Sequence, residues 1–145
     1  MTAGRFLACT AAVAVAMFIL AFIGHQLWLG HAYVAIEPIM RNQADMQAHI
    51  PFALISCLAF SGARVWIYSQ GRNPTSWLGQ GLRFGVAVWA IADLPPYLTN
   101  YTIEPWPGIF IAKILLGELC AAMILGILTA ALAKGDPDTV HGRTV

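Results

Sequence analysis

The sequence predicts an all-α integral membrane protein, a bundle of four transmembrane helices with both termini in the cytoplasm. Its 145 residues are 59% hydrophobic and only 10% charged, whereas soluble globular proteins carry roughly 25% charged residues. Four long apolar stretches follow one another along the chain, and basic residues gather at one end of them. We expect residues 1–134 to form a single transmembrane domain and residues 135–145 to form a polar cytoplasmic tail.

The first helix is expected at about residues 6–33. This stretch contains no Lys, Arg, Asp or Glu, and Trp28 and Tyr33 fit the aromatic belt at a membrane interface. Glu37-Pro38 is expected to mark the boundary, because the residue before a proline is disfavoured in helical conformation. The polar segment 39–49 that follows is expected to be a connection, with room for a short surface helix.

The second and third helices are expected at about residues 50–68 and 77–94. Pro51 fits the first turn of the second helix, where its missing N–H is not needed. Arg64 lies near the far end of that helix, and we expect its long side chain to extend to the interface. A proline pair ends the third helix, so residues 95–107 are expected to form a loop rich in proline and aromatic residues.

The fourth helix, residues 108–133, carries one carboxylate near its middle, Glu118. At about 1.5 Å per residue this helix exceeds the roughly 30 Å hydrocarbon core of a bilayer. An ionised acid near the bilayer centre costs roughly 3 kcal/mol or more on a lone helix. We therefore expect Glu118 to face protein rather than lipid.

Two ridges of small residues are expected to let helices pack closely. In steps of four from Glu118, the fourth helix continues with Ala122, Gly126 and Ala130, and the third helix carries a G-x-x-x-G pair, Gly81 and Gly85.

The distribution of basic residues sets the expected orientation. One face of the membrane holds Arg5, Arg64, Arg72, Arg83, Lys134 and Arg143, whereas the other holds Arg41 and, just inside the fourth helix, Lys113. Because positive loops stay in the cytoplasm, both termini are expected there, in a cell membrane of the bacterial inner-membrane type. The expected partners are membrane lipids, and either further copies of the chain or other membrane subunits. The net charge of +1 offers no basic patch for nucleic acid.

Five ionisable residues are expected in the outer half of the bundle and form the candidate binding or proton-exchange site. They are Glu118, Asp93, Lys113, His25 and His49. Charged groups within a membrane cost free energy that packing alone does not require, so they indicate function by default.

A structural interpretation stands beside the functional one for each of these residues. Asp93 can pair with Lys113 as a tie between helices, and Glu118 can be protonated and hydrogen-bonded. No metal or cofactor is expected, because His25 and His31 lack the spacing of a metal pair on a helix. A bis-histidine haem between His25 and His49 has only their placement on separate helices in its favour.

Two stretches give a partial family resemblance. Leu27-Trp28-Leu29-Gly30 ends the first helix, and residues 97–102, YLTNYT, are followed by Trp106-Pro107. Both resemble small bacterial multi-pass membrane proteins of uncharacterised function, of the DUF2177 type. That family usually has an aspartate before each motif, where this chain has His25-Gln26 and Pro96-Tyr97. The resemblance implies the four-helix architecture and no activity.

The expected function is the binding or passage of a small solute, ion or proton at an outward-facing polar pocket. The alternative is a non-catalytic subunit or assembly factor of a larger membrane complex. A third interpretation, a membrane enzyme acting on a lipid-like substrate, requires several of the ionisable residues to converge on one cavity. The sequence contains no G-x-S-x-G, P-loop or H-E-x-x-H motif, so no catalytic residue is predicted.

Overall fold

The structure is a computed structural model that describes residues 1–71 and 76–134. All regular structure in these two ranges is helical. In chain order the elements are α1 (Ala3–Ile23), the π-helical turn η1 (Gly24–Trp28), the 3-10 turns η2 (Tyr33–Ala35) and η3 (Glu37–Ile39), α2 (Gln43–Ala48), α3 (Ile50–Gln70), α4 (Trp77–Ala92), α5 (Leu94–Ile103) and α6 (Gly108–Ala133). The tail expected at residues 135–145 lies outside the described residues.

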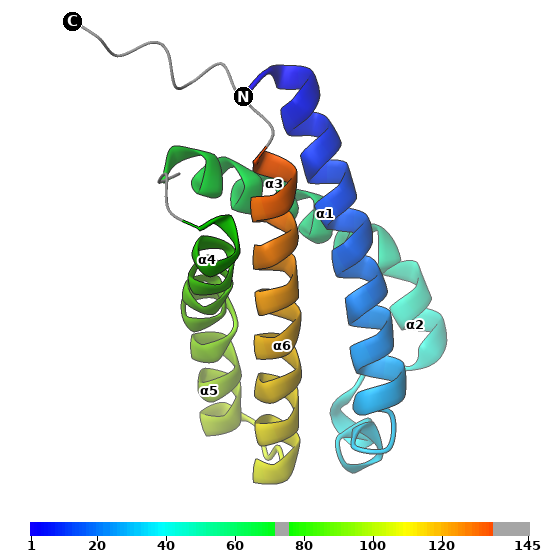
Figure 1. Ribbon diagram of the computed structural model, residues 1–145. Coiled ribbons are helices and arrows are strands. Elements are labelled where there is room, and N and C mark those ends of the chain that lie inside the picture. The colour runs from blue at the N-terminus through cyan, green and yellow to red at the C-terminus, as the bar shows by residue number, and fades with distance from the viewer. Residues whose placement is uncertain (72–75, 135–145) are drawn as a thin grey trace, which may run out of the picture.

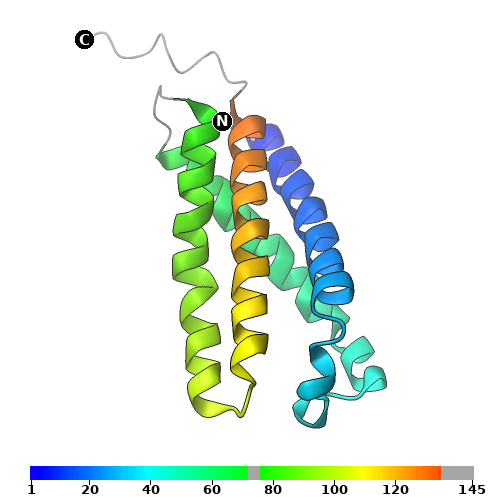
Figure 2. The same ribbon diagram turned by 60° about the horizontal axis from the view of Figure 1, so that its bottom comes forward.

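The helix α6 lies at the centre of the bundle (Figure 1). The helices α4 and α5 run along one side of it, α1 lies on the other side, and α3 crosses obliquely behind (Figure 2). The start of α1 and the end of α6 meet at one end of the bundle, where Nη2 of Arg5 donates to the Leu132 carbonyl over 2.9 Å. Helices from both ends of the described chain therefore pack together.

Three helical segments are long and apolar enough to cross a membrane: Ala3–Trp28, Ile50–Gln70 and Gly108–Ala133. The fourth expected span, α4, has 16 residues, fewer than the roughly 20 that a span needs, although α5 continues it in nearly the same direction (Figure 1). Large apolar side chains point outward from the bundle, among them Phe52 and Ile91, which are 68% and 78% exposed. An apolar exterior of this extent is typical of proteins that face lipid.

The closest helix contact joins α4 to α6 through the two ridges of small residues. A Cβ added to Gly81 would lie 2.8 Å from the Ala130 Cβ and 2.8 Å from the Gly126 carbonyl oxygen. One added to Gly126 would lie 2.8 Å from the Gly85 Cα. The backbones approach so closely that the helices fit together only with hydrogen atoms at these positions. The ridge of α4 therefore packs directly on the Ala122, Gly126 and Ala130 ridge of α6.

The first helix is shorter than expected. Its α-helical part ends at Ile23, and residues Gly24–Trp28 form a π-helical turn. The chain then bends at Gly30, where an added Cβ would lie 2.5 Å from the Gln26 carbonyl oxygen. A glycine at position 30 therefore permits the turn that follows the π-helical segment.

The prediction of a loop at residues 95–107 was wrong for most of that segment. The chain forms α5 instead, with Pro95 and Pro96 in its first turn. Proline ends a helix that precedes it but is well suited to begin a new one, since the first turn needs no N–H donor. Only residues 104–107 are non-helical, so Asp93 lies in a break between two nearly continuous helices rather than before a loop.

Candidate functional site

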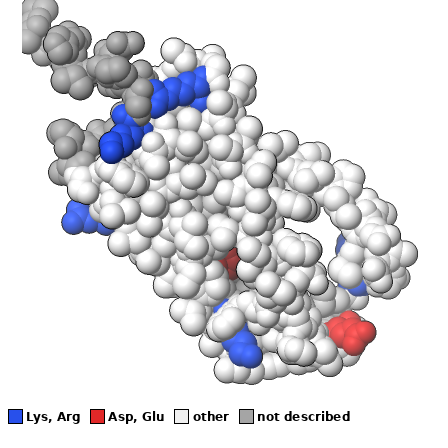
Figure 3. Space-filling model, turned by 45° about the vertical axis from the view of Figure 1, so that its right-hand side comes forward, with Lys and Arg blue, Asp and Glu red and all other residues white. Residues whose placement is uncertain are grey.

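A cavity of about 250 Å³ lies inside the bundle, bounded by α1 and η1, α3, the junction of α4 with α5, and α6. Its polar lining residues are His25, Arg64, Asp93, Tyr97 and Glu118. Figure 3 shows an acidic side chain at the bottom of a hollow in the otherwise uncharged central part of one face. The ionisable residues of the cavity thus come from four different elements of the chain.

The two carboxylates of the cavity come from the two sides of the closely packed α4–α6 contact. Asp93 occupies the junction where α4 ends and α5 begins, and Glu118 lies on α6. Both are half-buried, and neither forms an ion pair with any residue that the structure describes.

The burial of Arg64 corrects the sequence interpretation. The residue is only 3% exposed, and it does not reach the interface as expected. Its Nη2 donates to the Ala122 carbonyl over 2.8 Å, and the guanidinium lies 5.7 Å from the Phe60 ring centroid and 5.8 Å from that of Phe84. Its Nε is buried without a hydrogen-bond partner.

The sequence did contain a signal for this burial. Four residues recur at helical spacing and are buried on one face of α3: Ser61, Arg64, Val65 and Tyr68. This face packs against α1 and α6. Counting basic residues near helix ends does not reveal which side of a helix is buried.

The π-helical turn η1 presents His25 to the cavity. Nδ1 of His25 is hydrogen-bonded to the Tyr33 hydroxyl, and Nε1 of Trp28 donates to the Lys113 carbonyl of α6 over 3.0 Å. Burial raises the pKa of the Tyr33 phenol, and the Glu118 carboxylate raises it further, so this phenol stays protonated. Single π-helical turns within α-helices occur frequently at functional sites.

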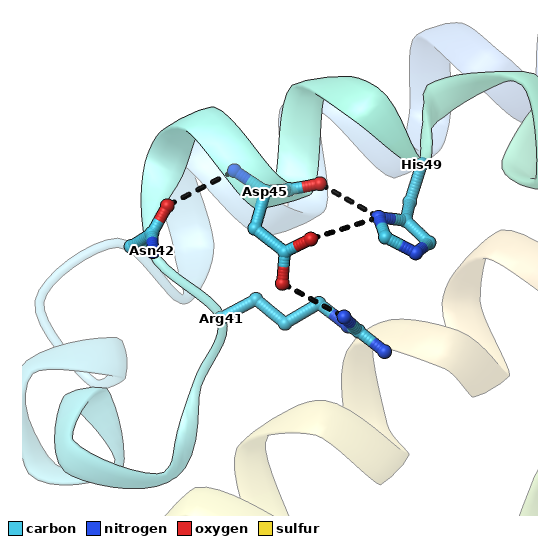
Figure 4. A network of polar contacts seen from close by, with 4 residues as sticks. All are labelled: Arg41, Asn42, Asp45 and His49. Atoms are coloured by element: carbon cyan, nitrogen blue, oxygen red, sulfur yellow. Dashed lines mark hydrogen bonds and ion pairs between the residues drawn. The ribbon is translucent and has the colours of Figure 1, made fainter.

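Two of the five expected site residues lie outside the cavity. Lys113 is exposed, does not line the cavity, and forms no ion pair with Asp93 in this part of the chain. His49 belongs to a surface network in which the Asp45 carboxylate contacts Arg41 over 2.7 Å and His49 over 3.2 Å (Figure 4). Asn42 caps the short helix α2 of this network by accepting from the Asp45 N–H. His25, Asp93 and Glu118 are thus the expected residues that come together, and Arg64 and Tyr97 are the ones that sequence reasoning missed.

The cavity combines hydrogen-bond donors and acceptors in an apolar frame. Arg64 supplies a cation with unused donor capacity, the two carboxylates supply acceptors or exchangeable protons, and His25 does either. Within residues 1–71 and 76–134, no group of three His, Cys, Asp or Glu residues is placed to hold a metal ion. The arrangement suits a small polar guest or proton transfer.

No protein-family model, no curated protein and no solved structure matches this chain.

Proposed function

We propose that this protein binds a small polar solute, an ion or a proton in the cavity, and passes it across the membrane. The observation that carries this proposal is the convergence of Arg64, Asp93, Glu118 and His25 on one space. The volume of about 250 Å³ has room for several water molecules or a small solute, and lies just below the roughly 300 Å³ at which pockets for drug-sized ligands begin.

The energetic cost of these groups supports a function over a purely structural role. A buried charge without a paired partner lowers the stability of the folded state by several kcal/mol. Arg64, Asp93 and Glu118 share the cavity without a direct ion pair among them. Packing alone would be served better by apolar residues of similar volume.

The topology that fits this proposal has four membrane crossings, with α4 and α5 together completing the third. Arg64 no longer counts toward the positive side of the membrane, because it is buried. The described basic residues Arg5, Arg83 and Lys134 remain toward the end of the bundle where α1 begins and α6 ends. Under the positive-inside rule this end faces the cytoplasm.

Proton flux into liposomes tests the role of Glu118. The purified chain is reconstituted with a pH-sensitive dye inside the vesicles, and Glu118→Gln is compared with Glu37→Gln. Glu37 lies in η3, is exposed and does not line the cavity, so it provides a matched control. We expect Glu118→Gln to lose most of the flux and Glu37→Gln to retain it; equal flux in a folded Glu118→Gln protein removes Glu118 from the mechanism.

The convergence of His25, Asp93 and Glu118 also favours a second candidate, a membrane enzyme acting on a lipid-like substrate. These groups would serve as general acid and base. The cavity has no Ser, Thr or Cys in its lining, and its volume is small for a diacyl lipid, so binding is the stronger proposal. Mass spectrometry of lipids incubated with the protein decides between them, since an enzyme yields a new product.

The third proposal, a subunit of a larger complex, has less support than the sequence indicated. The ridges of α4 and α6 that offered contact surfaces for partner helices fill each other. Purification in mild detergent tests the proposal directly, because a subunit co-purifies with its partner in a fixed ratio.

A further inference from the structure

The guanidinium of Arg64 is a buried cation on the wall of the cavity. It is fixed between two aromatic rings and by the Ala122 carbonyl, while its Nε is buried with no hydrogen-bond partner. A guanidinium held in one orientation with a free donor edge favours a planar or tetrahedral anion, above all a carboxylate or phosphate. Arg64 lines the cavity, and its hydrogen bond to Ala122 uses only Nη2, so Nη1 is the donor that a ligand in the cavity can meet.

Two acidic residues line the same cavity as Arg64. Asp93 and Glu118 line the cavity with Arg64, and neither forms an ion pair with any described residue. Carboxylates on the wall of a mainly apolar cavity favour an ammonium group on the guest. The cavity therefore has a cationic pole and an anionic pole.

The two poles are separated along α6. Nη2 of Arg64 is fixed at the Ala122 carbonyl, and the backbone of Glu118 lies four residues earlier, about 6 Å along the helix axis at about 1.5 Å per residue. Within the described chain, neither Asp93 nor Glu118 forms an ion pair with Arg64. A guest that satisfies both poles must carry opposite charges at separate atoms. A monatomic ion does not meet this requirement, whereas a small amino acid does.

We propose that the solute bound in this cavity is a small zwitterion of amino-acid size, with its anionic group on Arg64 and its ammonium group on Asp93 and Glu118. This inference rests on the proposed binding function and names its substrate class. The same charge pattern occurs in the headgroup of phosphatidylethanolamine. The cavity volume of about 250 Å³ and the position of Glu118 midway along α6 favour a free solute over a lipid.

Three probes of nearly equal size separate the contributions of the two poles. Radiolabelled 4-aminobutyrate carries both charges, butyrate carries only the anion, and butylamine carries only the cation. Binding of each to the full chain is measured in phosphatidylglycerol vesicles, with glycine as a shorter zwitterion. We expect a zwitterion to bind at least about tenfold more tightly than either single-charge probe, because each charged hydrogen bond contributes roughly 1.5 kcal/mol or more.

Substitutions then test which residue binds each charged group of the guest. Arg64→Gln is expected to reduce the affinity for 4-aminobutyrate to that for butylamine, and Glu118→Gln to reduce it to that for butyrate. Arg64→Lys keeps the charge and is expected to retain part of the affinity, which guards against a folding defect. Lys113→Gln, a change of an exposed cation on the same helix, is expected to leave binding unchanged.

The inference is overturned if butyrate or butylamine binds as tightly as the zwitterions, or if neither zwitterion binds saturably. Loss of binding when phosphatidylethanolamine is added to the vesicles assigns the site to a lipid headgroup instead. Absence of zwitterion binding alongside a Glu118-dependent proton flux overturns this inference and leaves the proposed function standing. Absence of both zwitterion binding and proton flux in the folded protein removes the proposed function as well.

Discussion

The two sides of α6 differ in what they contribute to the protein. Toward α4 the contact is dry, built from Gly81, Gly85 and Gly126, with backbone against backbone. Toward α1 and α3 the same helix borders a cavity that holds Arg64 and Glu118 without an ion pair between them. Dispersion forces stabilise the first side, whereas the second retains charges that lower stability. The contrast indicates that the α4–α6 pair supplies the rigidity that the cavity requires.

The largest effect is expected from filling the dry contact. Gly85→Val places a side chain where an added Cβ already lies 2.8 Å from the Met123 Cα, and should lower the free energy of unfolding by about 3 kcal/mol. Gly79→Val is the control on the same helix, because nothing lies within 4 Å of an added Cβ there. Thermal melts of both variants in detergent provide the measurement. Equal melting temperatures would contradict the close packing of α4 on α6.

An apolar replacement on the cavity side should act in the opposite direction. Arg64→Met removes a buried cation that lacks an ion-pair partner among the described residues, so the free energy of unfolding should rise by about 2 kcal/mol while proton flux or solute binding is lost. Arg41→Met, on the surface, serves as the control and should change stability by less than about 1 kcal/mol. A destabilised Arg64→Met protein would indicate that Arg64 is a structural tie.

A smaller effect is expected from the indole hydrogen bond that joins α4 to α6. Nε1 of Trp89 donates to the Leu115 carbonyl over 3.1 Å. Trp89→Phe keeps an aromatic ring and removes this donor, so stability should fall by about 1 kcal/mol with little change in flux. Trp28→Phe removes the corresponding bond on the cavity side and should reduce flux more than stability. If both variants alter only stability, the functional difference between the two sides of α6 is wrong.

The smallest effect is expected in the surface network of α2. Asp45→Asn weakens exposed ion pairs to Arg41 and His49, and such pairs contribute roughly 0.5 kcal/mol. Melting temperature should change little, and the difference should shrink further in high salt. A loss of flux in this variant would extend the functional region beyond the cavity.

The sequence predicted α6 to the residue, since its long apolar run begins after a proline and ends at a lysine. It also predicted the small-residue ridges that the structure packs together. It placed Arg64 wrongly because hydropathy reports the length of a helix and not its tilt, and the tilt of α3 decides what Arg64 faces. The π-helical turn at Gly24–Trp28 has no distinctive composition, since it depends on tertiary contacts such as the bond from Trp28 to α6.

Ala122 belongs to both sides of α6. Its backbone carbonyl lies against Gly85 of α4, and the same carbonyl oxygen accepts a hydrogen bond from Nη2 of Arg64. A sliding movement of α4 along α6 would therefore be felt at the guanidinium through a residue that has no functional group of its own. Because Ala122 also lines the cavity, a larger side chain at this position would change both the space open to a ligand and the contact that holds Arg64.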